Sequence, residues 1–138
     1  MLRGKLGKIQ TEEEIRAFVE EHCSGSSTIK DHLSHILAKK EITFSSLLEK
    51  SNINKNYGYN LISGARKNPG RDKVIAICVG AEMTFQETQE TLDIAKVGRL
   101  YYCDERDVRI AAAINSKIGS VTKLNLALAE HGLAPLDV

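Results

Sequence analysis

Basic side chains gather in the middle of this 138-residue chain, between Asn54 and Lys73. That segment has one acidic residue, Asp72, against five basic ones: Lys55, Arg66, Lys67, Arg71 and Lys73. The acids gather instead in the ranges 12–21 and 82–93. Because Lys and Arg N–H groups bind phosphate oxygens, the cluster favours nucleic acid as a partner. The alternative is a solvated loop whose charges only keep the protein soluble.

Metal and thiol chemistry find little support in the sequence. His32 and His35 lie three residues apart on an expected helix, but no carboxylate or cysteine stands at a diagnostic distance, so we expect both to face solvent. The three cysteines, Cys23, Cys78 and Cys103, form no CxxC pair and are odd in number, which indicates reduced thiols. Cys78 lies in an apolar run and is expected in the core.

Catalytic motifs are also missing from the sequence. It contains no Gly-rich phosphate loop, no HExxH and no GxSxG. We therefore expect a protein that is not an enzyme and needs no cofactor or metal.

The basic cluster begins within a stretch, Thr43 to Pro69, that is typical of two short helices joined by a tight turn. The apolar residues that would join the two helices are Phe44, Leu47, Leu48, Ile53 and Leu61. Asn52 and Ile53 supply the turn, and Asn54 the cap of the second helix. That helix, Lys55 to Ser63, would be offered to a partner, and the DNA major groove is the first candidate.

Helical spacing of apolar residues covers the rest of the chain, with no strand pattern and no repeat. Two capping boxes, Thr11 to Glu14 and Thr84 to Glu87, open helices. Further helices are expected at 29–40 and 71–80. Another would begin at a cap on Asp104 and end before Gly119, and the last would run from a cap on Ser120 to His131, these two forming a hairpin. Its buried faces would consist of Val108, Ala111, Ala112 and Ile114 on one helix and Val121, Leu124 and Leu128 on the other.

Composition agrees with a small cytoplasmic protein. The hydrophobic content of 42% suffices for a core. The longest apolar run, Val74 to Val79, is far below the roughly 20 residues that span a bilayer. The N-terminal residues lack the apolar segment of a signal peptide, so no membrane association is expected.

The order of these elements resembles the lambda-repressor-like, or XRE, family of five-helix DNA-binding domains, over about Ile29 to Ala95. The resemblance is carried by the motif helices, the turn at Asn52, the Ser63-Gly64 helix end and the loop Arg66-Lys67-Asn68-Pro69. The segments NINKNYGYNLISGARKNPGRDKV, FQETQETLDIAKVGRLYY and ERDVRIAAAIN are also similar to a group of bacterial helix-turn-helix proteins. Some members of that group are encoded beside serine/threonine kinases.

The resemblance implies roles for individual residues. Positions that read base edges in the family fall on Lys55, Asn56 and Asn60, and Lys and Asn can pair with guanine and adenine respectively. Tyr59, next to them on the helix, is a further base-reading candidate, because its ring could touch a thymine methyl group; a contact with a phosphate is the alternative. Phosphate contacts fall on Asn54, Ser63, Arg66 and Lys67, with Arg71 and Lys73 as further candidates.

The chain departs from the family pattern at three positions. Phe44 stands where the family commonly has Gln, Leu48 where it has Ala, and Gly58 where it has a branched aliphatic residue. We expect the last two to compensate, with Leu48 filling the space over Gly58. Tyr57 is expected to pack rather than to read bases, while for Tyr59 packing and base contact stay open.

The sequence thus predicts an all-α protein with three parts: an acidic helix and linker (1–28), a lambda-repressor-like domain (29–97) and a helical hairpin (98–138). The resemblance implies a bacterial transcriptional regulator that binds double-stranded DNA, with a homodimer expected because few phosphate contacts are available to one chain. The alternative is a non-enzymatic signalling adaptor that binds a protein such as a kinase. Phe44, the near-neutral net charge and the acidic first helix favour that alternative.

Overall fold

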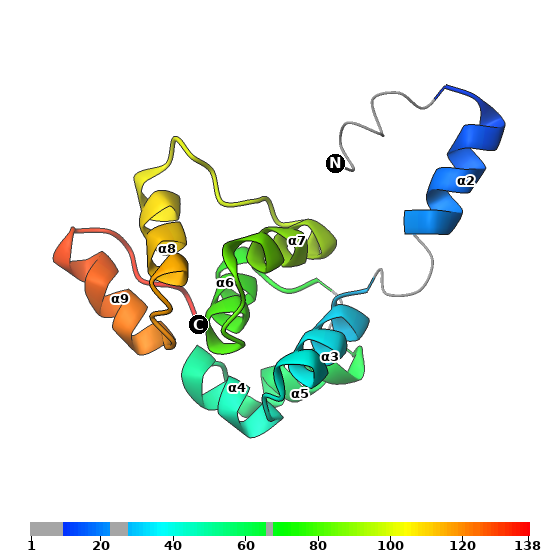
Figure 1. Ribbon diagram of the computed structural model, residues 1–138. Helices are drawn as coiled ribbons and strands as arrows, with labels where there is room; N and C mark the ends of the chain where they lie inside the picture. The colour runs from blue at the N-terminus through cyan, green and yellow to red at the C-terminus, as the bar shows by residue number, and fades with distance from the viewer. Residues whose placement is uncertain (1–9, 23–27, 66–67) are drawn as a thin grey trace.

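The computed structural model describes residues 10–22, 28–65 and 68–138, which form eight α-helices and no strand (Figure 1). The predicted all-α class is therefore confirmed. The helices are α2 (Glu12–His22), α3 (Ile29–Lys40), α4 (Phe44–Ser51), α5 (Lys55–Ser63), α6 (Arg71–Gly80), α7 (Phe85–Ala95), α8 (Glu105–Asn115) and α9 (Val121–Glu130). The predicted linker at 23–27 lies outside the described residues.

Side-chain caps fix where most helices begin. The Thr84 hydroxyl accepts from the Glu87 N–H at 3.1 Å while the Glu87 carboxylate accepts from the Thr84 N–H at 2.9 Å, so this capping box is complete. At Thr11 only half of the predicted box is formed. Its hydroxyl accepts from the Glu14 N–H but donates to the Glu14 carboxylate, which leaves that carboxylate away from the backbone.

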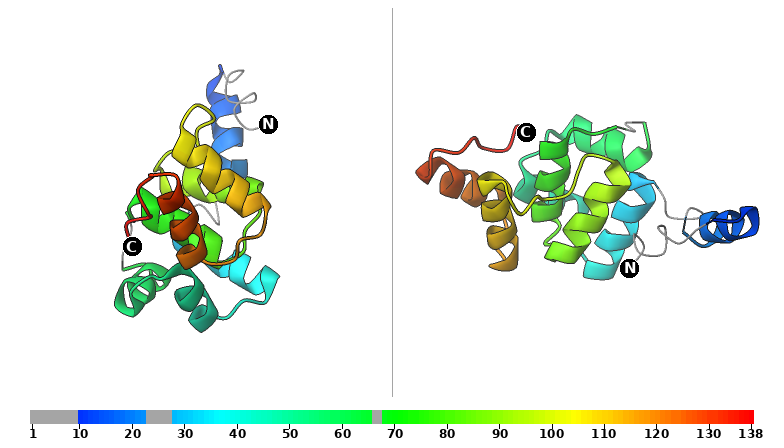
Figure 2. Two further views of the ribbon diagram at one scale, coloured as in Figure 1. Left: turned by 90° about the vertical axis from the view of Figure 1, so that its left-hand side faces the viewer. Right: turned by 90° about the horizontal axis from the view of Figure 1, so that it is seen from above.

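Helix α6 occupies the centre of the molecule. Every residue from Val74 to Gly80 is buried, and α6 packs on α4, α7 and α9. Gly80 permits the closest approach, since a Cβ there would lie 2.9 Å from the Ser51 Cβ and 3.0 Å from the Leu47 carbonyl oxygen of α4. In Figures 1 and 2, α8 and α9 lie on one side of α6, with α3 and α7 on the other.

The hairpin buries a different face of α8 from the one expected. Val108 is 47% exposed and Ala112 is exposed, whereas Asp107, Ile110 and Ile114 are buried. The prediction for Val108 and Ala112 was wrong because α8 turns a carboxylate inward, toward an arginine of α6. On α9 the predicted face of Val121, Leu124 and Leu128 is confirmed.

The first half of helix α2 faces solvent, since residues 10–17 are exposed and Ile15 is 43% exposed. Among the described helices, none is long and apolar enough to cross a membrane.

Candidate nucleic-acid interface

The α4–α5 pair is fixed at both ends by its turn residues. Asn52 ends α4 in the left-handed conformation, with φ of 61°, and Ile53 after it is buried. The Asn54 Oδ1 accepts from the N–H groups of Asn56, at 2.9 Å, and Tyr57, at 3.4 Å. Gly64, with φ of 88°, ends α5. The turn and caps predicted from the sequence are therefore present, and they hold α5 rigidly.

One face of α5 is exposed along its whole length. Gly58 and Leu61 are buried on the opposite face. The exposed positions fall on one side because they repeat at helical spacing: Lys55, Asn56, Tyr59, Asn60 and Ser63. The structure thus brings together all four predicted base-reading residues on one outward-facing surface, named here the α5 face.

An aromatic pair joins α4 to the α5 face. The ring centroids of Phe44 and Tyr59 lie 4.8 Å apart at an interplanar angle of 42°. The Lys55 Nζ stands 5.7 Å from the centroid of the Tyr59 ring, within cation–π range. Phe44 and Lys55 therefore both contact the Tyr59 ring.

Gly58 explains how α4 and α5 come so close. A Cβ at this position would overlap the Leu48 Cδ2 and stand 3.2 Å from the Phe44 Cζ. The expected compensation between Leu48 and Gly58 is confirmed by this geometry. Tyr57 is half-buried against the core, and the Lys73 Nζ lies 5.0 Å from its ring centroid, in agreement with the packing role expected for it.

The predicted phosphate-binding residues differ in which of their polar atoms already make contacts within the fold. Because the Asn54 Oδ1 is used by the helix cap, a phosphate contact would fall to its Nδ2 amide. The Ser63 hydroxyl donates to the Asn60 carbonyl oxygen at 3.2 Å. Lys73 is drawn toward the Tyr57 ring and the Val138 carbonyl oxygen, 3.4 Å away. Arg66 and Lys67 lie outside the described residues.

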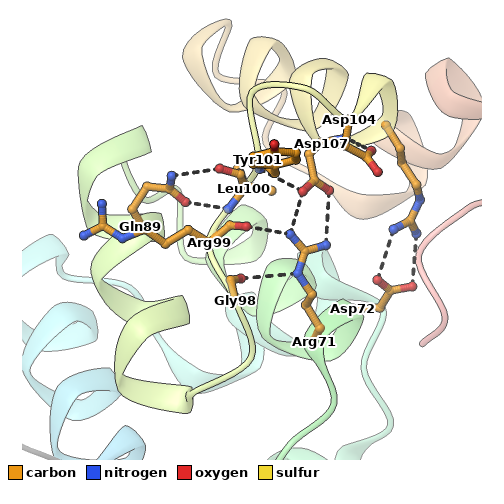
Figure 3. A network of polar contacts seen from close by, with 10 residues as sticks. Arg71, Asp72, Gln89, Gly98, Arg99, Leu100, Tyr101, Asp104 and Asp107 are labelled. Atoms are coloured by element: carbon orange, nitrogen blue, oxygen red, sulfur yellow. Dashed lines mark hydrogen bonds and ion pairs between the residues drawn. The ribbon is translucent and has the colours of Figure 1, made fainter.

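The Arg71 guanidinium makes its hydrogen bonds within the fold, so its predicted phosphate role needs correction. Its Nη1 and Nη2 donate to Asp107 at 3.1 and 2.7 Å, while its Nε donates to the Gly98 carbonyl and its Nη2 also to that of Arg99 (Figure 3). The Asp107 side chain is 7% exposed. A guanidinium that satisfies a buried carboxylate and two carbonyl groups is not available to DNA.

A second ion pair runs the opposite way between the same helices. Arg106 of α8 donates to both carboxylate oxygens of Asp72 at 3.2 and 3.0 Å. Burial acts to raise the pKa of Asp72, but hydrogen bonds from Arg106 and the Asp137 N–H outweigh it, so the pKa is lowered. The charge of Asp72, the one acid in the basic segment, is thereby balanced by Arg106 within the fold.

His32 contradicts the expectation that both histidines face solvent. It is buried, and its Nε2 lies 2.8 Å from the Thr91 Oγ1. That hydroxyl donates to the Glu87 carbonyl at 2.7 Å, so it accepts from the Nε2–H of the ring. Burial lowers the pKa of His32, which favours the neutral ring. His35 is exposed as expected.

Of the two cysteines that the structure describes, Cys78 is buried and Cys103 is exposed. Cys78 is buried as expected, and desolvation raises its pKa to about 12, so it is an unreactive core residue. No group of three or more His, Cys, Asp and Glu side chains in the described ranges could hold a metal ion.

Comparison of the chain with protein-family models, with curated proteins and with solved structures finds no match in any of the three. Function is therefore argued from the residues of the α5 face and their surroundings.

Proposed function

We propose that this chain is a sequence-specific DNA-binding protein, a transcriptional regulator that uses α4 and α5 as a helix-turn-helix and lays α5 in the major groove. The observation that carries the proposal is the α5 face. It presents Lys55, Asn56 and Asn60 from one rigid, capped helix whose other side is buried. An α-helix with its side chains is about 10–12 Å across, so α5 can enter a major groove that is about 12 Å wide.

The chemistry of the α5 face suits base edges. A lysine Nζ can donate to guanine O6 and N7, and an asparagine amide can pair with adenine N6 and N7. Lys55, Asn56 and Asn60 are exposed and lie within two turns of one another, so they would meet neighbouring base pairs. Asn54 and Ser63 stand at the two ends of α5, and Arg66 and Lys67 follow it in the sequence; phosphate contacts by these residues would set the register.

Selection from randomised duplex DNA at moderate salt tests the proposal. We expect the full chain to recover a shared sequence, arranged as paired half-sites if the chain binds as a dimer. The triple variant Lys55→Ala/Asn56→Ala/Asn60→Ala should keep its helical circular dichroism and lose this specific binding. A matched variant of exposed hairpin residues, Asn115→Ala/Lys123→Ala, should bind like the wild type. Unchanged binding by the triple variant would refute the mechanism.

A protein-binding role is the second candidate, and one observation favours it. A groove of about 500 Å³ runs along α8 and α9, with an apolar floor that includes Ala113, Ala127 and Leu128. Its lining also contains Lys117, Lys123 and His131 and no acidic residue. Such a groove fits an acidic partner helix. If DNA selection returns no shared sequence, this role becomes the leading one.

A further inference from the structure

Tyr59 is placed in a way that the needs of the core do not explain. Its side chain is 50% exposed in the middle of an otherwise polar face. Phe44, Leu48 and Tyr57 all pack against the hydrophobic core cluster, whereas Tyr59 does not belong to that set. Its ring is nevertheless held, since Phe44 lies against it at 4.8 Å. An anchored, half-exposed ring on a binding surface provides apolar contact area at a low entropic cost.

We propose that Tyr59 determines specificity by packing its ring against the C5 methyl group of a thymine. This inference rests on the proposed function and adds the identity of one base. The reason is chemical: among the base edges in the major groove, the thymine methyl is the one apolar group, and all the others are hydrogen-bond donors or acceptors. A ring on the exposed face of α5 has no other apolar partner there.

Lys55 places a second base beside that thymine. It is one helical turn before Tyr59, and its Nζ lies 5.7 Å from the Tyr59 ring centroid. Successive bases on one strand are about 3.4 Å apart, so two groups at this separation meet bases about one or two steps apart. Because Lys55 is suited to guanine, the recognised sequence should carry a guanine within two steps of the thymine.

Phe44 acts as a positioning residue in this arrangement. Its ring touches Tyr59 on one side and stands over Gly58 on the other, where a Cβ would come within 3.2 Å of the Phe44 Cζ. The absent side chain at Gly58 is therefore what lets the Phe44 ring reach under Tyr59. Phe44 touches the reading residue rather than the base.

Replacing thymine by deoxyuridine tests the inference, because it removes only the methyl group. Each thymine of the selected sequence would be replaced in turn, and Kd measured for the wild type, Tyr59→Phe and Tyr59→Ala. Loss of one buried methyl corresponds to about a fourfold weakening. We expect that loss at one thymine for the wild type and Tyr59→Phe, and equal affinity for thymine and deoxyuridine with Tyr59→Ala.

Phe44→Leu provides the test of positioning. It keeps an apolar side chain in the core but removes the ring beneath Tyr59. In this variant we expect the Kd for DNA with deoxyuridine, divided by the Kd for DNA with thymine, to fall toward one. The midpoint of its unfolding transition should stay close to that of the wild type. A Lys123→Ala control, on α9, should keep the full ratio.

The outcomes separate this inference from the proposed function. A shared sequence that tolerates deoxyuridine at every thymine would overturn the role of Tyr59 and leave DNA binding intact. Loss of binding in Tyr59→Phe without deoxyuridine sensitivity in the wild type would assign the phenol to a phosphate instead. A selection that returns no shared sequence would remove both proposals.

Discussion

At the scale of single residues, Gly58 and Leu48 form a large-small pair that can be tested as a pair. Leu48→Ala should cost about 2 kcal/mol of unfolding free energy because it opens the space over Gly58. Gly58→Ala gains about 1 kcal/mol of helix propensity but overpacks against Leu48, which costs about 1–3 kcal/mol. We therefore expect a net loss of up to about 2 kcal/mol for Gly58→Ala in urea denaturation.

The double variant Leu48→Ala/Gly58→Ala decides whether the two positions are coupled. With Leu48 shortened, the methyl group that Gly58→Ala adds meets no overlapping atom, so the double variant should be more stable than the sum of the single losses predicts. A coupling free energy of about 1 kcal/mol or more is expected. Additive losses would show that Leu48 does not fill the gap.

His32 makes stability depend on pH. Its pKa is lowered in the folded state by burial, whereas in the unfolded chain it is near 6.5. Below about pH 6.5 the unfolded chain therefore binds a proton at His32 that the folded chain does not bind. The free energy of unfolding falls as the pH falls toward the pKa of the folded state. The slope for one such group is at most about 1.4 kcal/mol per pH unit.

Replacing His32 by Gln isolates this effect. Gln can keep a hydrogen bond to Thr91 but does not titrate, so His32→Gln should lose less stability than the wild type between pH 7 and pH 5. Thermal melts across that range measure the difference. An identical slope for His32→Gln and the wild type would mean that the ring is not held neutral.

At the scale of elements, the reciprocal ion pairs between α6 and α8 fix the hairpin. Asp107→Asn leaves the Arg71 guanidinium, 29% exposed, without its charged partner. We expect a loss of about 2–3 kcal/mol, toward the low end for breaking a buried pair because Arg71 keeps some solvent. Asp93→Asn is the matched control. It breaks the Arg99–Asp93 pair, in which both side chains are 41% exposed, and should cost less than about 1 kcal/mol in urea denaturation.

The sequence predicts a feature of the fold well when the residues that interact are close together in the chain. Caps are local, so Asn54 and Thr84 marked their helices correctly from residues at most three positions away. The expected compensation at Gly58 also came from the sequence, through the family resemblance. The family pattern indicated which positions face each other.

Long-range polar contacts could not be predicted in this way. Arg71 was expected to be free to bind phosphate because its partner, Asp107, is 36 residues away in the sequence. His32 counted as solvent-facing because its partner, Thr91, is 59 residues away. The inward turn of Asp107 also moved Val108 to the surface. A carboxylate that begins a helical stripe of apolar residues, as Asp107 does before Ile110 and Ile114, is the signal that could have found the buried pair.

At the scale of the whole molecule, the position of α6 implies cooperative unfolding. Since α6 packs on α4, α7 and α9, loss of packing in α9 removes support from α6 as well. Leu128→Ala, at a fully buried position of α9, should cost about 2–5 kcal/mol and speed amide hydrogen exchange in α6 as much as in α9. Leu126→Ala in the same helix, at a residue 63% exposed, is the control and should change neither. Faster exchange confined to α9 would show that the hairpin unfolds alone.

Electrostatics of the whole molecule predict a shallow salt dependence for DNA binding. The formal net charge is +1, and Arg71 and Arg106 are used within the fold. Arg66, Lys67 and Lys73 are the cations of the basic segment that remain as candidates for phosphate contacts, if Lys55 is taken by a base. With a slope of about −0.9 per phosphate contact, log K against log salt should fall with a slope of about −2 to −3 for each bound chain. Fluorescence anisotropy between 50 and 200 mM salt, roughly the range in which such slopes are read, gives this value.

The loop cations can be separated from the rest of the charge in the same titration. Arg66→Ala/Lys67→Ala should make the slope shallower by about 1.8 for each chain, because two counterion-releasing contacts are lost. Lys123→Ala, at an exposed position of α9, should leave the slope as it is. A slope near zero for the wild type would mean that the cations of the basic segment do not meet phosphates, which would count against the proposed DNA binding. A slope far steeper than about −3 for each chain would mean that cations beyond the α5 region, such as those along the α8–α9 groove, also meet the DNA.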